Sequence, residues 1–169
     1  MISPEIVAAA IGALLVWIFQ LFDKLRDRGR RRQSTLVAVA SEVQAICFLI
    51  RKQGYLEAFH AQANAIRAGH WDGMSYVIDI RGEYSKVFSS NATHLSDLRP
   101  AHVSKIVSFY TFCQSLIDST RPDGPGANTE DRDEKAQHVI GVEAGLTTIL
   151  MLGDEIVQFP KIRLPVLAQ

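Results

Sequence analysis

The chain has 169 residues, and its 18 lysine and arginine residues balance 18 aspartate and glutamate residues. The neutral total hides an asymmetry, because residues 23–32 carry a net charge of +4 and residues 33–169 a net charge of −3. No C-x-x-C pair is present, and none of the five histidines has a zinc-type spacing to a cysteine, so we expect neither a metal nor another cofactor. We expect Cys47 and Cys113 to be free, buried thiols.

An almost uninterrupted apolar run occupies residues 6–22, between Glu5 and Asp23. A helix rises about 1.5 Å per residue, so this run reaches roughly 26 Å, at the short end of what crosses the apolar core of a bilayer. A cleaved signal peptide carries its positive charge before the run, whereas here the charge follows it. We therefore expect an uncleaved, single-pass transmembrane helix, with a buried helix of a soluble protein as the alternative.

Six basic residues follow the apolar run directly. They are Lys24, Arg26, Arg28, Arg30, Arg31 and Arg32, called the basic collar below. Lysine and arginine beside a span are retained on the cytoplasmic side, which predicts an outer N-terminus and a cytoplasmic C-terminal region. The collar also lies at the level of anionic headgroups, so we expect membrane lipid as a partner. A nucleic-acid-binding arm is the alternative, and the lack of interleaved aromatic residues disfavours it.

Small residues recur within the apolar run. Ala8 and Gly12 lie four positions apart, a spacing that lets two transmembrane helices approach closely. Ala9 and Ala13 repeat the spacing one residue later. This pattern predicts self-association through the span, and because alanine is common in spans, a span that does not associate remains the alternative.

Three later segments repeat apolar residues at intervals of three and four, the period of an amphipathic helix. The stripes are Leu36, Val39, Val43, Ile46 and Ile50; Val103, Ile106, Tyr110, Cys113 and Ile117; and Val139, Val142, Leu146, Ile149, Gly153 and Ile156. We expect all of these side chains to pack in one core.

Local signals place the ends of these helices. Ser34 is the expected cap of the first, which bends near Gly54 and continues. Pro100 suits the first turn of the second helix, where a backbone N–H would have no partner. The third runs from about Thr129 to Pro160, with acidic residues in its first turns.

The predicted fold class is all-α. Residues 1–32 form the transmembrane anchor with its collar, and residues 33–169 form an antiparallel cytoplasmic bundle of about three long helices. About 135 residues suffice for one domain with a core of its own.

The long connector, residues 69–99, contains a group of titratable side chains, namely His70, Asp72, Asp79 and Glu83. Surface ion pairing is their expected role, since an enzyme would need them to converge on one pocket. A link of this length usually has structure of its own, so we expect a short helix or two, or an extended segment that covers one end of the bundle.

One acidic residue, Glu143, lies in the most apolar part of the third helix. It either points outward or faces the core. In the second case it needs a partner such as Lys105 or Arg67, because an unpaired buried carboxylate is costly.

Three motifs follow one another at the start of the second helix: Val87-Phe88-x-x-Asn91, Leu95-x-x-Leu98-x-Pro100 and Val103-x-x-Ile106-Val107-x-Phe109-Tyr110. Over residues 84–117 the chain resembles uncharacterised small bacterial membrane proteins with one N-terminal span, a basic collar and a helical cytoplasmic region. The resemblance implies the bacterial inner membrane and an accessory or mobile-element product, without an activity. Physically, the motifs favour packing, with Leu95 and Leu98 closing the end of the bundle.

Three functions are compatible with these features. The first is a membrane-anchored helical interaction or scaffold module without catalytic activity, which binds a protein partner or a second copy. The second is a membrane-acting effector or sensor of a mobile-element or antiviral system that oligomerises through its span. The third is an enzyme using the connector, which we do not favour. Neither nucleic acid nor a small-molecule substrate is expected.

Overall fold

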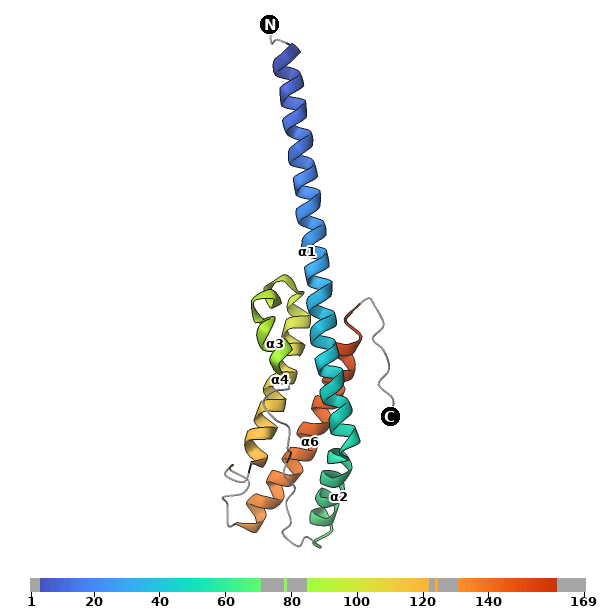
Figure 1. Cartoon of the computed structure of the whole chain (residues 1–169). Coiled ribbons are helices and arrows are strands. Elements are labelled where there is room, and N and C mark those ends of the chain that lie inside the picture. Colours follow the sequence, from blue (N-terminus) through green and yellow to red (C-terminus); the bar gives the residue numbers. More distant parts are fainter. Residues whose placement is uncertain (1–3, 71–77, 79–84, 122–123, 125–130, 161–169) are drawn as a thin grey trace.

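The structure is a computed structural model that describes residues 4–70, 78, 85–121, 124 and 131–160, with the backbone alone at residues 4–11. Every regular element in these ranges is helical, as predicted. Figure 1 shows one long helix whose N-terminal half stands clear of the rest. The other helices gather around its C-terminal half, and we call residues 33–160 the helical body. Its near end is the one from which the long helix projects, and its far end is opposite.

Helix α1 (Pro4–Lys52) continues for 49 residues, or about 73 Å, from the apolar run into the helical body. The prediction that Ser34 caps a separate helix is therefore wrong. The intervening residues are mostly arginine, lysine and leucine, which favour helix, and no proline interrupts them. By length and composition, α1 is able to cross a membrane.

The two halves of α1 differ in exposure. From residue 12 to residue 31 every side chain is exposed except the half-buried Ile18. Trp17, Phe19 and Phe22 expose 60%, 70% and 66% of their surface. From Leu36 onward the predicted stripe is buried. The same helix therefore has an exposed N-terminal part, whose apolar residues up to Phe22 we call the apolar rod, and a C-terminal part that packs in the core.

Helix α2 (Tyr55–Arg67) follows α1 after a bend at Gly54, as expected. Gly54 has φ 65° and ψ 26°, the left-handed conformation that glycine adopts most readily. Helix α2 packs on α6 (Arg132–Val157) at the far end of the helical body.

Two short helices lie in the described part of the connector: α3 (Lys86–Ser90) is followed by the 3-10 helix η2 (Ala92–Asp97). Helix α4 (Pro100–Thr120) starts directly after it, with Pro100 in its first turn. Leu98 is buried at the near end and Leu95 packs against the same core, which agrees with the expected packing of these two residues.

Helices α1 and α4 run in the same direction, and α6 runs in the opposite direction (Figure 1). Glu42 of α1 accordingly meets Tyr110 of α4, while Phe159, just after α6, stacks on His102 in the first turn of α4. The expectation that neighbouring helices are all antiparallel is wrong for this pair. Short loops force antiparallel neighbours, whereas the connector before α3 is long enough to return the chain to the near end.

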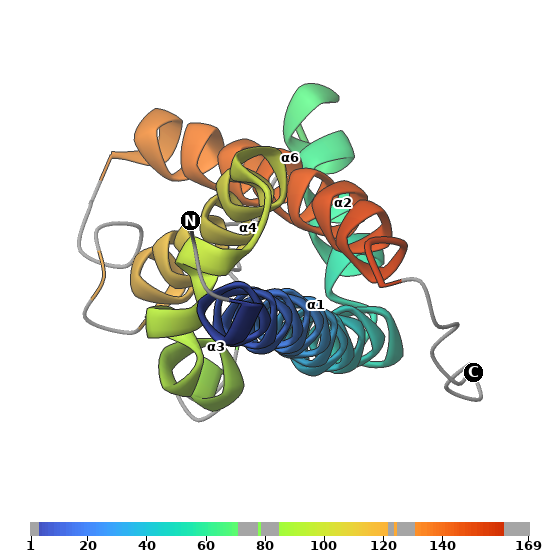
Figure 2. The same ribbon diagram turned by 90° about the horizontal axis from the view of Figure 1, so that it is seen from above.

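The core lies between α1, α4 and α6 (Figure 2). All residues of the first and third predicted stripes are buried, as are Ile106 and Tyr110 of the second. Phe109 is fully buried as well, because it packs against α6 beside Gly153, so α4 buries a wider stripe than predicted. Gly153 of α6 packs directly against Cys47 of α1, because an added Cβ would lie 2.2 Å from the Sγ of Cys47.

Helix α6 begins at a side-chain cap. The carboxylate of Asp131 accepts hydrogen bonds from the backbone N–H groups of Asp133, at 2.7 Å, and of Glu134. The predicted start near Thr129 is thus about three residues early, while the acidic first turn is as expected.

Candidate functional site: a groove along α4 and the membrane segment

A single carboxylate of α1 joins three helices. Glu42 is half-buried and accepts hydrogen bonds from the backbone N–H groups of Val87, at 2.8 Å, and Phe88, at 3.0 Å. The hydroxyl of Tyr110 donates to the same carboxylate. Because the first N–H groups of a helix have no partner within it, Glu42 satisfies two donors of α3 and fixes α3 beside α4.

Two aromatic rings complete this junction. Phe88 of α3 stacks on Tyr110 of α4, with ring centroids 4.1 Å apart and planes 17° apart. Burial raises the pKa of Tyr110, and its hydrogen bond to Glu42 raises that pKa further, so the phenol stays protonated and remains a donor. The junction therefore holds α3 at a fixed distance from the rest of α4.

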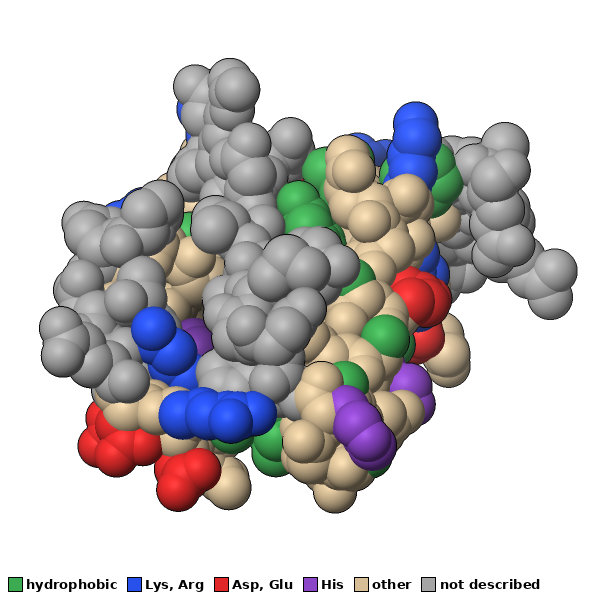
Figure 3. Space-filling view, turned by 90° about the horizontal axis from the view of Figure 1, so that it is seen from below, with side chains coloured by type: hydrophobic (Ala, Val, Ile, Leu, Met, Phe, Trp, Pro, Cys, Tyr) green, Lys and Arg blue, Asp and Glu red, His purple; other side chains and the backbone are tan. Residues whose placement is uncertain are grey.

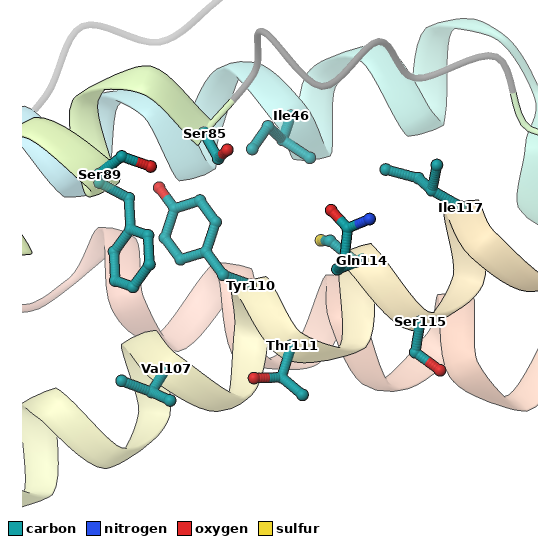
Figure 4. A pocket seen from close by; sticks show the side chains of 11 residues that line it. Ile46, Ser85, Ser89, Val107, Tyr110, Thr111, Gln114, Ser115 and Ile117 are labelled. Carbon is teal, nitrogen blue, oxygen red and sulfur yellow. The ribbon is translucent and has the colours of Figure 1, made fainter.

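A groove of about 510 Å³ opens between α1, α3 and α4, next to this junction (Figure 4). We call it the α4 groove. It is lined by Ile46, Ser85, Phe88, Ser89, Val107, Tyr110, Thr111, Cys113, Gln114, Ser115 and Ile117. Figure 4 places Tyr110 and Ser89 at one end of the groove, and Gln114 and Ile117 at the other.

The α4 groove contains no charged side chain among its lining residues, because α4 carries no charge from Ile106 to Ile117. Its surface combines apolar groups with hydroxyls and one amide. Val107 remains 42% exposed although it is a large apolar residue. Depletion of charge together with exposed apolar and aromatic groups is the composition of a protein-binding surface.

The chemistry available in the described residues is limited. They contain no group of three histidine, cysteine, aspartate or glutamate side chains that could hold a metal ion. Burial raises the pKa of the Cys113 thiol, which lines the groove, and of the Cys47 thiol behind it, in both cases to about 12. Both cysteines are free thiols, as expected, and are protonated at neutral pH; Cys47 is buried as predicted, whereas Cys113 is only half-buried.

The structure places the basic collar on the exposed part of α1. Lys24, Arg26, Arg28, Arg30 and Arg31 are exposed, and Arg32 is half-buried where α1 enters the helical body. Successive helix positions turn by about 100°, so these six side chains surround α1 on all sides. Within the described part of the chain none of them forms an ion pair.

The expected self-association face lies in the same rod. Gly12 is exposed, and a Cβ added there would meet no atom within 4 Å, so another helix could approach it. Ala8 lies in helical backbone, and its side chain is outside the described residues.

Glu143 faces a partner in the helical body, and Arg67 is one of the two partners predicted for it. Its side chain is 15% exposed, lies 2.8 Å from Nδ1 of His60, and accepts a hydrogen bond of 2.9 Å from Arg67. These two contacts, that with His60 first, hold the pKa of Glu143 below its usual value. Lys105, the other candidate, pairs with Glu155 instead.

Three of the four titratable connector residues lie outside the part of the chain that the structure describes. Asp72, Asp79 and Glu83 lie outside the described residues, and His70 is exposed at the far end, just after α2.

Sequence reasoning missed Glu42, which builds the groove. A signal was present: Glu42 lies three residues after Val39 and four before Ile46, at the edge of a buried stripe. A lone carboxylate at such a position needs donors from another part of the chain.

Comparison with protein-family models, curated proteins and solved structures found no match. The resemblance of residues 84–117 to small bacterial membrane proteins therefore remains an interpretation of the sequence.

Proposed function

We propose that this protein is a membrane-anchored helical interaction module without catalytic activity. The observation that carries the proposal is the continuity of α1, which joins an exposed apolar rod to the core of the helical body without a linker. A rod this apolar is stable in lipid and unfavourable in water. In the proposed orientation the N-terminus lies outside and the helical body in the cytoplasm of a bacterial cell, because the basic collar follows the span.

The α4 groove is the proposed interaction surface. Its partner is a protein segment that presents apolar side chains, such as one face of an amphipathic helix, because such a segment buries Val107 and Phe88 without stranding a charge. The hydroxyl groups of Thr111 and Ser115 are exposed in the groove and can form hydrogen bonds with such a segment, whereas the side-chain NH2 of Gln114 already donates to Asp118. The body of a partner protein would thereby be held at the membrane.

The anchor is tested by alkaline carbonate extraction of membranes that contain the full-length protein. We expect it to stay in the pellet, whereas recovery in the supernatant would contradict the anchor.

The groove is tested by a photo-crosslinking amino acid at Thr111, inside the groove, and at Thr147, an exposed residue of α6 outside it. We expect a discrete crosslinked protein from position 111 alone, and its loss when Val107→Asp places a charge in the groove. Equal crosslinking from both positions, or insensitivity to Val107→Asp in a folded variant, would contradict the groove as the interface.

A second function, a membrane-acting effector or sensor that oligomerises through its span, is favoured by the open space around Gly12. Gly12→Leu fills that space and would reduce crosslinking between spans and any leakage caused by expression. If Gly12→Leu changes neither, or no leakage occurs under any condition, this second function is wrong.

A further inference from the structure

Basic side chains from distant parts of the sequence meet at the near end of the helical body. Arg32 is the last residue of the collar, and Arg99 immediately precedes α4. Both lie close enough to His102, in the first turn of α4, to lower its pKa together with Lys105, although burial is the larger cause. Phe159 stacks on His102 at a centroid distance of 4.2 Å and joins the end of α6 to this surface.

These charges differ in whether they have a partner. Lys105 is paired with Glu155, whereas neither Arg32 nor Arg99 forms an ion pair within the described part of the chain. Asp97, at the end of η2, is the acidic residue nearest to Arg99 in the sequence, and it is exposed. The far end is different, because Figure 3 shows acidic and basic side chains side by side there.

The distance to the membrane is short enough for these charges to matter. Arg32 lies ten positions after Phe22, the last residue of the apolar run, which corresponds to about 15 Å of helix. The headgroup layer fills about 5–7 Å of this. The remaining gap of about 8–10 Å is comparable to a Debye length at physiological salt, and an arginine side chain spans much of it.

The position of α1 allows the gap to narrow. Seen along α1, helices α2, α4 and α6 lie on one side of it (Figure 2). Transmembrane helices tilt by about 20° on average, and at an interaxial distance of about 10 Å such a tilt brings the start of α4 about 3 Å closer to the membrane surface, so the length of the arginine side chains covers the rest.

We propose, building on the proposed membrane anchor, that the near end of the helical body is a docking surface for anionic lipid headgroups, with Arg99 acting together with Arg32 and the collar. The partner is the negatively charged leaflet surface itself, whose phosphate groups are recognised by Arg32 and Arg99, which form no ion pair with another described residue. Docking holds the helical body against the membrane at a defined tilt.

The test uses the full-length protein in vesicles of phosphatidylcholine, with or without phosphatidylglycerol, that carry a nitroxide on a fraction of the headgroups. A fluorophore is attached to cysteine at Ala101, which is exposed in the first turn of α4, or at Gln137, an exposed far-end control on α6. We expect quenching at position 101 to be stronger in the anionic vesicles, to decrease at high salt, and to be absent at position 137.

Charge variants then separate this surface from the collar. Arg99→Gln should shift the docked population about fivefold toward the undocked state, the effect of about one basic residue at a membrane surface. Arg121→Gln, which removes an exposed arginine paired with Asp118 at the far end, should change nothing.

Three outcomes would overturn the proposal: equal quenching in neutral and anionic vesicles, unchanged quenching in Arg99→Gln, or an Arg99-dependent binding of duplex nucleic acid without any lipid effect. Failure of the anchor is distinct, because the unlabelled protein would then not float with the vesicles at all.

Discussion

Removing the carboxylate of Glu42 should detach α3 from the helical body. In Glu42→Ala the N–H groups of Val87 and Phe88 lose their acceptor, and the hydroxyl of Tyr110 loses a charged one. Each half-buried donor left without a partner costs about 1–3 kcal/mol. Since the site is half-buried, we expect about 1 kcal/mol for each of the three donors, which gives a total loss of about 3 kcal/mol in the free energy of unfolding. That is a large part of the stability of a domain this size.

Urea unfolding of the full-length protein in detergent, followed by circular dichroism, measures this loss. Hydrogen exchange at Val87 and Phe88 provides a local readout, and both amides should lose protection in Glu42→Ala. Glu42→Gln retains the shape but replaces one acceptor with a donor, so its loss should be intermediate. Glu57→Ala is the matched control, because Glu57 is an exposed glutamate of α2, and its loss should stay below about 1 kcal/mol. Unchanged exchange at the two amides, or equal losses in Glu42→Ala and Glu57→Ala, would refute the role given to Glu42.

Three further outcomes are expected. Gly153→Ala forces a Cβ against the Sγ of Cys47 and should lower the free energy of unfolding by about 1–3 kcal/mol. Gly141→Ala, on the exposed face of α6, should instead raise it by up to about 1 kcal/mol. Equal effects of the two substitutions would contradict the close packing at Gly153. The contacts that lower the pKa of Glu143 stabilise the fold at pH values above the ordinary pKa of 4.5, and this contribution is lost as the pH falls through the lower pKa of the folded state. In Glu143→Gln the free energy of unfolding should therefore depend less on pH in this acid range. An unchanged pH dependence would argue against the contacts of Glu143 with α2. The buried thiol of Cys47 should resist alkylation at neutral pH until urea unfolds the protein, whereas the half-buried Cys113, which lines the α4 groove, should be labelled first; equally rapid labelling of Cys47 in the native protein would show that it is not buried.

The buried faces of the helices could be predicted because helical periodicity is a local property of the sequence. Leu36 to Ile50 and Val139 to Ile156 are buried at the positions that the spacing of three and four selects. The break at Ser34 was wrong for the complementary reason. A serine is an effective cap only where the helix would otherwise end, and α1 is already established on both sides of it.

The candidate site depended on contacts that the sequence does not encode locally. Glu42 is 45 residues from Val87 and 68 from Tyr110, so no spacing rule connects them. The parallel direction of α1 and α4 is likewise not encoded in either helix, because the long chain between α2 and α3 allows either direction. Arg67 could be named as a partner of Glu143 only because a buried carboxylate requires a cation, and His60 was not recognised as the second partner.

Because α1 is uninterrupted, the number of residues between the apolar run and the helical body fixes how the helical body is rotated about the axis of α1 relative to the apolar run. Each residue added between residues 23 and 31 would turn the body by about 100° around the helix axis and move it by about 1.5 Å. An insertion of one residue would thus point the α4 groove in another direction relative to the span, while an insertion of seven would bring it back to within about 20°. With the proposed membrane anchor, the length of this short segment therefore sets the direction in which the α4 groove faces a neighbouring protein.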